Sequence, residues 1–184
     1  PNCTFITYLE WWFNPTSAFF HYDESNPEIG ISRNSIKKNW DRNRFIALEL
    51  ASSDQIICPT NWQRSQLPKM LQNNCEVVFD GIDLDYFSVN LISRSSFPLL
   101  TYGTRGMDPF RGFPQFIRSL PQILARNDSL KVEIAGNNGV FYGSMPEEFK
   151  NWQDWAIDYL KKHNVYERVS WRGFLQSEEY VKWL

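Results

Sequence analysis

The chain has 184 residues and a formal net charge of −2, with 42% hydrophobic and 22% charged residues. This length is enough to bury a substantial core in one large domain or two small ones, and the composition is typical of a folded globular protein. The slightly acidic balance argues against a nucleic-acid partner bound through a broad basic surface, and no apolar run approaches the roughly 20 residues of a membrane span.

The cysteines and histidines form no metal-ligand pattern. Cys3, Cys58 and Cys75 lack the spacing of zinc ligands, and the chain has only two histidines, His21 and His163. We therefore expect no metal site and a reducing, cytoplasmic location. Because the chain begins with proline rather than methionine, and its last residues, SEEYVKWL, read as a helix that has just begun, we also expect a fragment of a longer protein.

The first half of the chain is predicted to alternate between strands and helices. Residues 35–51 have apolar side chains at roughly helical spacing with basic residues between them, which predicts an amphipathic helix. Thr60 is suited to cap a second helix, which Pro68 would kink or end. The predicted elements are strands over 5–9, 55–59 and 76–79 and helices over 35–51 and 61–72.

The alternation continues in the second half, after a predicted interdomain linker over residues 84–97 that has no sustained periodicity. The predicted elements are strands over 99–103, 131–135 and 169–172, helices over 113–125 and 149–163, and a helix that starts at Ser177. Strands and helices that alternate in this way predict right-handed crossovers and a parallel sheet. The sequence therefore indicates an α/β fold with parallel sheets.

The most informative segment runs from Leu99 to Ser119, because it reads as a strand, a turn rich in Gly and Arg, and a helix. In parallel α/β proteins this order presents a helix N-terminus to an anion. Arg105 and Arg111 lie in the turn, where two permanently charged guanidinium groups suit a diphosphate, although Asp108 is an alternative partner for either of them. Three glycines would let the backbone bend and approach a ligand: Gly103, Gly106 and Gly112.

Two further loops are expected at the same edge of this sheet, because the carboxyl ends of parallel strands meet there. One follows the strand over 131–135 and the other ends the strand over 169–172. The candidate residues are Gly136, Asn137 and Asn138 in the first loop and Gly173, Phe174 and Leu175 in the second. An ordinary turn is the alternative interpretation of Gly-Asn-Asn.

Four segments occur in a recognisable order: DQIICPTNWQRSQLP, EVVFDGIDLDYF, TYGTRGMDPFRGFPQFIRSLPQIL and KVEIAGNNGVFYG. In order and composition they resemble glycosyltransferases of family 4 (the glycosyl transferases group 1 superfamily), which have the GT-B fold of two Rossmann-like domains. The likeness runs from about Tyr8 to the C-terminus. It implies that residues 1–83 belong to the N-terminal, acceptor-side domain, that 84–97 are the linker, and that 98–184 begin the C-terminal domain that binds the nucleotide-sugar donor.

The resemblance also implies roles for the donor-side candidates. Arg105 and Arg111 would bind the donor diphosphate and stabilise negative charge as the glycosidic bond breaks. The residues from Gly173 to Leu175 would hold the nucleobase through backbone groups, and the other donor-side glycines, with Asn137, would line the donor site.

Acceptor-side candidates follow from the same likeness. Thr60, Asn61 and Trp62 stand at the carboxyl end of a predicted strand and should face the cleft. Trp62 would stack against a sugar ring, with packing inside the domain as the alternative. Glu10 and the Arg33-Asn34 pair are weaker candidates.

The activity that the resemblance implies is transfer of a sugar from a nucleotide-diphosphate sugar, with retention and without a bound metal or other cofactor. The acceptor would be a glycan or a lipid-linked glycan in polysaccharide biosynthesis. The location would be the cytoplasm, with peripheral contact to the inner face of the membrane as a further possibility.

One hallmark of the family does not occur in this sequence, namely two glutamates separated by seven residues that bind the donor sugar and ribose. Glu147-Glu148 and Glu178-Glu179 are adjacent pairs at predicted helix starts instead. We therefore expect the fragment to be inactive or nearly so, and to associate as a dimer through exposed apolar surface. The alternative is a non-catalytic nucleotide- or glycan-binding module on the same fold, whereas an NAD enzyme is disfavoured because no G-x-G-x-x-G follows the strand at Leu99.

Overall fold

A computed structural model describes residues 3–14, 33–87, 97–141 and 143–183, with side chains of the first helix described from Ile36 onward. The chain divides into two compact units, of which one extends to Ile82 and the other begins at Asp83. Most of the predicted linker over 84–97 lies outside the described residues. No helix in the described ranges is both long and apolar enough to cross a lipid bilayer.

The first unit contains a parallel sheet of three strands in the order β1-β2-β3. The strands are β1 (Ile6–Tyr8), β2 (Gln55–Cys58) and β3 (Cys75–Val77), and the helices are α1 (Arg33–Ala51), α2 (Asn61–Gln66) and α3 (Lys69–Gln72). The helix predicted over 61–72 is divided at Pro68, as expected, since the backbone of Leu67 and Pro68 is extended. Thr60 caps α2 by accepting a hydrogen bond from the backbone N–H of Gln63 at 3.2 Å, which confirms that prediction.

The core of the first unit contains two free cysteines on neighbouring strands. Cys58 and Cys75 are almost fully buried, and their sulfur atoms lie 3.4 Å apart. Burial and the neighbouring thiol raise the pKa of Cys75 to about 12. Both buried side chains pack as small apolar groups in the core. The other buried residues of this core are Leu9, Leu50, Ile56 and Leu67.

The second unit also contains a parallel sheet of three strands, in the order β4-β5-β6. Its strands are β4 (Leu99–Gly106), β5 (Lys131–Asn137) and β6 (Val169–Gly173), and its helices are α4 (Phe113–Ala125), α5 (Trp152–Lys162) and α6 (Ser177–Trp183). Short 3-10 helices lie at Pro109–Arg111 (η3) and Tyr166–Arg168 (η4). The prediction of parallel α/β units is therefore confirmed, and the predicted bounds of α4 are those of the structure.

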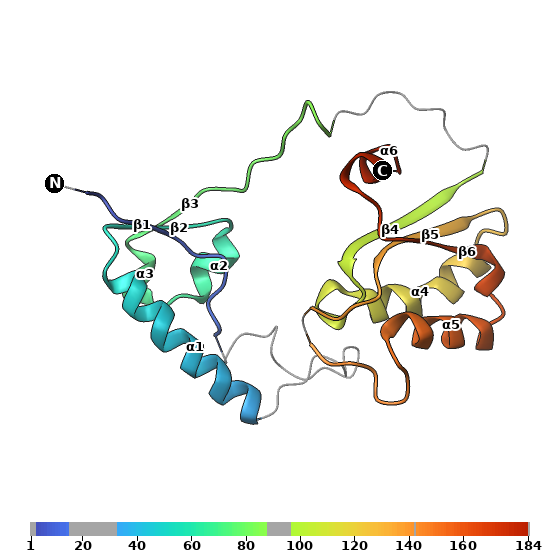
Figure 1. Ribbon diagram of the computed structural model, residues 1–184, viewed down its shortest axis with the longest axis horizontal. Coiled ribbons are helices and arrows are strands. Elements are labelled where there is room, and N and C mark those ends of the chain that lie inside the picture. Colours follow the sequence, from blue (N-terminus) through green and yellow to red (C-terminus); the bar gives the residue numbers. More distant parts are fainter. Residues whose placement is uncertain (1–2, 15–32, 88–96, 142, 184) are drawn as a thin grey trace. The chain divides into compact units, whose positions relative to one another are not determined.

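Helices α4 and α5 cover one face of this sheet, and α6 lies on the opposite side (Figure 1). Apolar residues three or four positions apart on α4 pack against buried residues of β5 and α5. The fully buried members from these three elements are Phe113, Ile117, Leu120, Leu124, Val132, Ile134, Ala156 and Leu160. This core holds the carboxyl ends of the strands in place, and the candidate site lies at those ends.

The structure corrects several predicted boundaries in the second unit. Strand β4 extends to Gly106 rather than 103, and β5 extends to Asn137 rather than 135. Helix α5 begins at Trp152 rather than at 149, because the side chain of Asn151 accepts the backbone N–H of Asp154 at 2.8 Å and caps the helix there. The prediction that Glu147-Glu148 stands at a helix start is therefore wrong.

Candidate functional site

A pocket of about 460 Å³ lies in the second unit at the carboxyl ends of its strands. Its volume is within the range of ordinary small-molecule sites. It is lined by residues of β4, of the turn after β4, of β5, of the segment from β6 into α6, and of the start of the unit: Tyr86, Phe87, Tyr102, Gly103, Thr104, Arg105, Arg111, Ala135, Gly136, Phe174, Leu175, Ser177 and Tyr180.

In the turn after β4, hydrogen bonds to both the backbone N–H and the carbonyl oxygen of Arg111 hold the backbone in place. The carboxylate of Asp108, which is fully buried, accepts the Arg111 backbone N–H at 3.2 Å. The Tyr102 hydroxyl donates to the Arg111 carbonyl oxygen at 2.8 Å. Burial, the largest effect, raises the pKa of Tyr102 to about 12, so this hydroxyl remains a donor at neutral pH.

Arg105 is positioned by an aromatic ring from another loop. Its guanidinium carbon lies 4.6 Å from the centroid of the Phe141 ring, in a cation–π arrangement. The Phe141 backbone N–H donates to the second carboxylate oxygen of Asp108 at 3.4 Å. Asp108, proposed from the sequence as an ion-pair partner of the arginines, therefore holds backbone groups of both loops.

The charge of the pocket is positive. Its lining residues include two arginines and no aspartate or glutamate. Arginine keeps its charge at any physiological pH and has donors spaced to bind two oxygens of a carboxylate or phosphate. The arrangement can bind an anion with several oxygens, such as a diphosphate.

Close contacts between backbone segments shape the floor of the pocket. Gly136 has φ +149°, and a Cβ there would collide with the carbonyl oxygen of Thr104. A glycine at this position lets β5 pass close to β4. A Cβ on Gly103 would lie 2.6 Å from the Tyr180 hydroxyl, which shows how closely α6 packs over β4.

Helix α6, which supplies Ser177 and Tyr180 to the pocket wall, is attached to the sheet by a charged cluster. Glu133 accepts two hydrogen bonds from Arg172, at 2.6 and 2.9 Å, and a third from the Trp183 indole N–H at 2.8 Å. The hydrogen bonds from Arg172 lower the pKa of Glu133 more than burial raises it. The carboxylate therefore stays charged and attached at neutral pH.

Six of the ten donor-side candidates line this pocket, namely Gly103, Arg105, Arg111, Gly136, Phe174 and Leu175. The other four lie close by in the chain without lining it. Gly106 and Asn137 are paired at the ends of β4 and β5, Gly112 precedes α4 and Gly173 ends β6.

Sequence reasoning missed the other lining residues. Tyr102 and Ala135 lie on the predicted strands and Thr104 directly follows one, each beside a chosen glycine, and their position at the strand ends is a signal that could have found them. Tyr180 and Ser177 belong to the helix after β6, which nothing in the local sequence brings back over β4. Tyr86 and Phe87 fall in the segment that the sequence assigned to the linker.

The acceptor-side candidates lie together in the first unit, after β1 and β2. Trp62 is 44% exposed, and its ring centroid lies 5.7 Å from that of Trp11. The side chain of Gln63 donates to the carbonyl oxygen of Glu10 at 2.7 Å and accepts from the Thr60 hydroxyl. Asn61 begins α2.

Other candidates contribute no described contacts to a site. The side chains of Arg33 and Asn34 lie outside the described residues. Asn138 is exposed after β5 and does not line the pocket. Within the described ranges, no three His, Cys, Asp or Glu side chains gather closely enough to hold a metal ion.

Comparison with known proteins gives a family match in the first unit. Residues 1–87 match the family model described as "Glycosyl transferase family 4 group". No curated protein sequence matches the chain.

Solved structures with the same fold cover 83–97% of the chain. TarM is 14% identical with a TM-score of 0.57, and the match covers 97% of this chain and 30% of TarM. Sucrose-phosphate synthase from Thermosynechococcus elongatus is 14% identical with a TM-score of 0.57, over 83% of this chain and 38% of that one. HepE from Anabaena, solved with UDP and glucose, is 12% identical with a TM-score of 0.57. The match covers 95% of this chain and 42% of HepE.

The chain spans less than half the length of each of these three proteins. Their fold and the two parallel sheets agree with the family match in the first unit. The family match over residues 1–87 and the fold shared with these structures support an assignment to glycosyltransferase family 4, and the chain has the GT-B fold.

Proposed function

We propose that the protein transfers a sugar from a nucleotide-diphosphate sugar and that the pocket of the second unit binds the donor. The observation that supports this most directly is that Arg105 and Arg111 both line the pocket and no acidic residue does. Two of the solved structures with this fold, HepE and a variant of Staphylococcus aureus TarM, were crystallised with UDP.

In the proposed reaction the two guanidinium groups act on the leaving group. As the bond between the anomeric carbon and the diphosphate oxygen breaks, that oxygen gains negative charge, and fixed cations nearby stabilise it more in the transition state than in the bound substrate. The acceptor hydroxyl oxygen then bonds to the anomeric carbon with retention of configuration, and its proton passes to the departing diphosphate. Arginine supplies the positive charge in this scheme, so the proposal requires no bound metal.

The lining residues that follow β6 suit the nucleobase. Phe174 is 62% exposed and follows β6 beside Leu175. An exposed aromatic ring can stack on a flat base, and the base edge can bond to backbone groups of the same segment. We assign the base to this segment and the sugar to the region of Gly103 and Gly136.

We place the acceptor, a glycan or lipid-linked glycan of a polysaccharide pathway, on the first unit. Trp11 and Trp62 lie together after the carboxyl ends of β1 and β2, where parallel sheets commonly bind ligands. Aromatic faces of this kind suit sugar rings. Glu10, Thr60 and Asn61 would supply polar contacts beside them.

Calorimetric titration of the protein with UDP, GDP, ADP and UMP tests the donor site. We expect saturable binding of one nucleoside diphosphate and at least tenfold weaker binding of the matching monophosphate, because loss of the β-phosphate removes a charged hydrogen bond of about 1.5–3 kcal/mol. Equal affinity for the monophosphate, or no binding of any of the four, would contradict the proposal.

A second candidate function is a nucleotide- or glycan-binding module without transferase activity. It is favoured by the sequence, in which no two glutamates are separated by seven residues. Release of UDP from a nucleotide sugar in the presence of acceptor would separate the two, since a binding module retains affinity without turnover.

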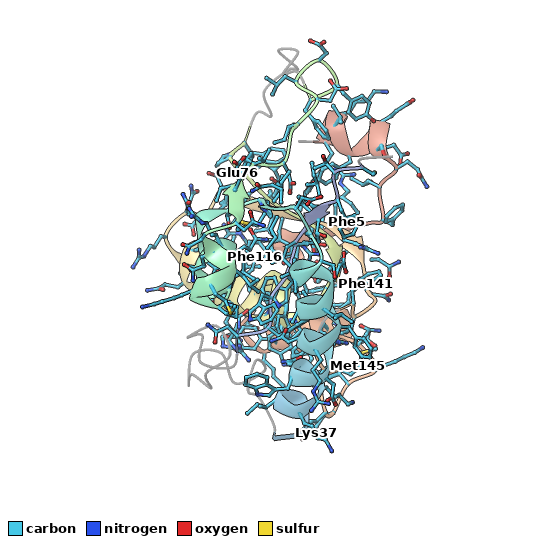
Figure 2. All side chains as sticks on the ribbon, turned by 90° about the vertical axis from the view of Figure 1, so that its left-hand side faces the viewer. Phe5, Lys37, Glu76, Phe116, Phe141 and Met145 are labelled. Carbon is cyan, nitrogen blue, oxygen red and sulfur yellow. The ribbon has the colours of Figure 1, made fainter. Side chains whose placement is uncertain are left out.

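We also propose that α1 contacts the inner face of a membrane from the cytoplasm. Trp40, Phe45 and Leu48 are exposed on this helix, at 53%, 78% and 71%. The helix has five basic and two acidic residues, and one of the acids, Asp41, pairs with Arg44 at 3.4 Å. Figure 2 shows Lys37 toward the N-terminal end of α1, away from Phe5, the residue before β1. Exposed aromatic and basic side chains on one helix are typical of interfacial binding.

Vesicle flotation tests this contact. We expect the protein to float with phosphatidylcholine vesicles that contain phosphatidylglycerol and to stay behind with phosphatidylcholine alone. Lys37→Glu/Lys38→Glu should weaken binding at least tenfold, because each basic residue near an anionic surface contributes about 1 kcal/mol. A dimer that covers these side chains would instead give a doubled mass in light scattering, without flotation, and would contradict the membrane proposal.

A further inference from the structure

We infer that Asp108 and Phe141 are positioning residues that hold Arg105 and Arg111 in the orientation needed to bind a diphosphate. Neither residue lines the pocket. The inference rests on the proposed function of the pocket. Two residues that do not line the pocket would then hold its two positively charged side chains in place.

Asp108 joins two loops that are distant in sequence. Its side chain is fully buried, with one carboxylate oxygen on the Arg111 backbone N–H and the other on the Phe141 backbone N–H. A buried carboxylate is retained only where its oxygens have donors. Because these donors come from the turn after β4 and from the loop after β5, one side chain fixes the distance between the two loops.

Phe141 connects Asp108 to Arg105. Its backbone is held by Asp108, and its ring lies under the guanidinium group at 4.6 Å. The ring occupies the space beside Gly106, where a Cβ would overlap it. Although Phe141 is 45% exposed, its ring is therefore located by contacts on two sides.

Orienting an arginine before the ligand arrives has a clear energetic effect. A free arginine side chain samples many rotamers, and ordering it on binding reduces affinity. A guanidinium group that already rests on an aromatic ring has lost part of that freedom, and it keeps its N–H groups at the ring's edge available for oxygen atoms. Asp108 acts on Arg111 less directly, because it fixes the backbone of the turn from which the Arg111 side chain extends.

The test is the affinity for UDP, measured by calorimetry, of wild type and of Phe141→Leu, Phe141→Tyr and Asp108→Asn. We expect Phe141→Leu to weaken binding about two- to fivefold, which is the contribution of an exposed cation–π contact, and Phe141→Tyr to restore it. Asp108→Asn keeps the side-chain shape but loses one acceptor, and we expect a larger loss. Phe97→Leu is the matched control, because Phe97 has the same 45% exposure, lies in the same unit and does not line the pocket.

A double-mutant cycle separates positioning from general stability. In an Arg105→Ala background, Phe141→Leu should have no further effect on UDP affinity, because the group it orients is absent. Asp108→Asn should still weaken binding there, because it also holds the turn of Arg111. A structural defect would weaken UDP binding equally in both backgrounds.

Two results would overturn the inference while leaving the proposed function standing. One is wild-type affinity in Phe141→Leu, and the other is an effect of Phe141→Leu that adds fully to that of Arg105→Ala. If Asp108→Asn fails to fold, the Phe141 cycle still decides the question. Failure of the wild-type protein to bind UDP or any other nucleoside diphosphate would instead reject the proposed function itself.

Discussion

Replacement of Arg105 and Arg111 together by alanine is expected to remove nearly all affinity for a nucleoside diphosphate. Each charge-assisted hydrogen bond contributes about 1.5–3 kcal/mol, so loss of two predicts a decrease of about 10²- to 10⁴-fold. Both side chains are exposed at the pocket, and we therefore expect little change in the free energy of unfolding. Calorimetric titration with the nucleotide that binds wild type most tightly measures the effect.

A second double variant controls for the loss of two positive charges. Arg126→Ala/Lys131→Ala removes the same charge from exposed positions of the second unit that do not line the pocket. If binding depends on the local geometry of the turn, this variant should retain the affinity of wild type within about twofold, since charges beyond the Debye length of roughly 10 Å are screened. Equal losses in the two variants would show that only the overall charge attracts the nucleotide.

Much of the fold could be predicted because local signals agreed with the final structure. Pro68 divides a predicted helix where its ring and missing N–H require. The apolar spacing of Phe113, Ile117, Leu120 and Leu124 corresponds to the buried face of α4. Strand ends were less accurate, since the extension of β4 to Gly106 depends on pairing with β5, and a pairing partner is not visible in the local sequence.

The candidate site was predictable to the extent that parallel strands end at one edge. This rule alone places Arg105, Gly136 and Phe174 near one another, and all three line the pocket. It could not place Tyr180, because the position of α6 over Gly103 depends on contacts between Glu133, Arg172 and Trp183. The role of Asp108 could not be predicted either. A carboxylate close to arginines in the sequence suggests an ion pair, whereas in the structure Asp108 accepts two backbone hydrogen bonds.

Phe113→Ala is expected to destabilise the second unit by about 3–5 kcal/mol, the usual cost of removing a buried phenylalanine ring. Its side chain is fully buried, and its ring centroid lies 5.8 Å from that of Tyr102 and 6.4 Å from that of Trp171. The cavity would lie beneath the turn of Arg111, because Phe113 begins α4 directly after Gly112. Urea unfolding followed by hydrogen exchange of individual peptides measures the change in each unit separately.

The same experiment tests whether the two cores are energetically independent. Phe97→Ala removes the same ring from a half-exposed position, and we expect it to cost less than about 1 kcal/mol. The buried cluster around Phe113 contains residues of the second unit, whereas that around Ile56 contains residues of the first. Phe113→Ala should therefore reduce protection only in peptides after Asp83. Equal loss of protection in peptides of the first unit would mean that the units unfold together, and the stability of the donor pocket would then depend on both cores.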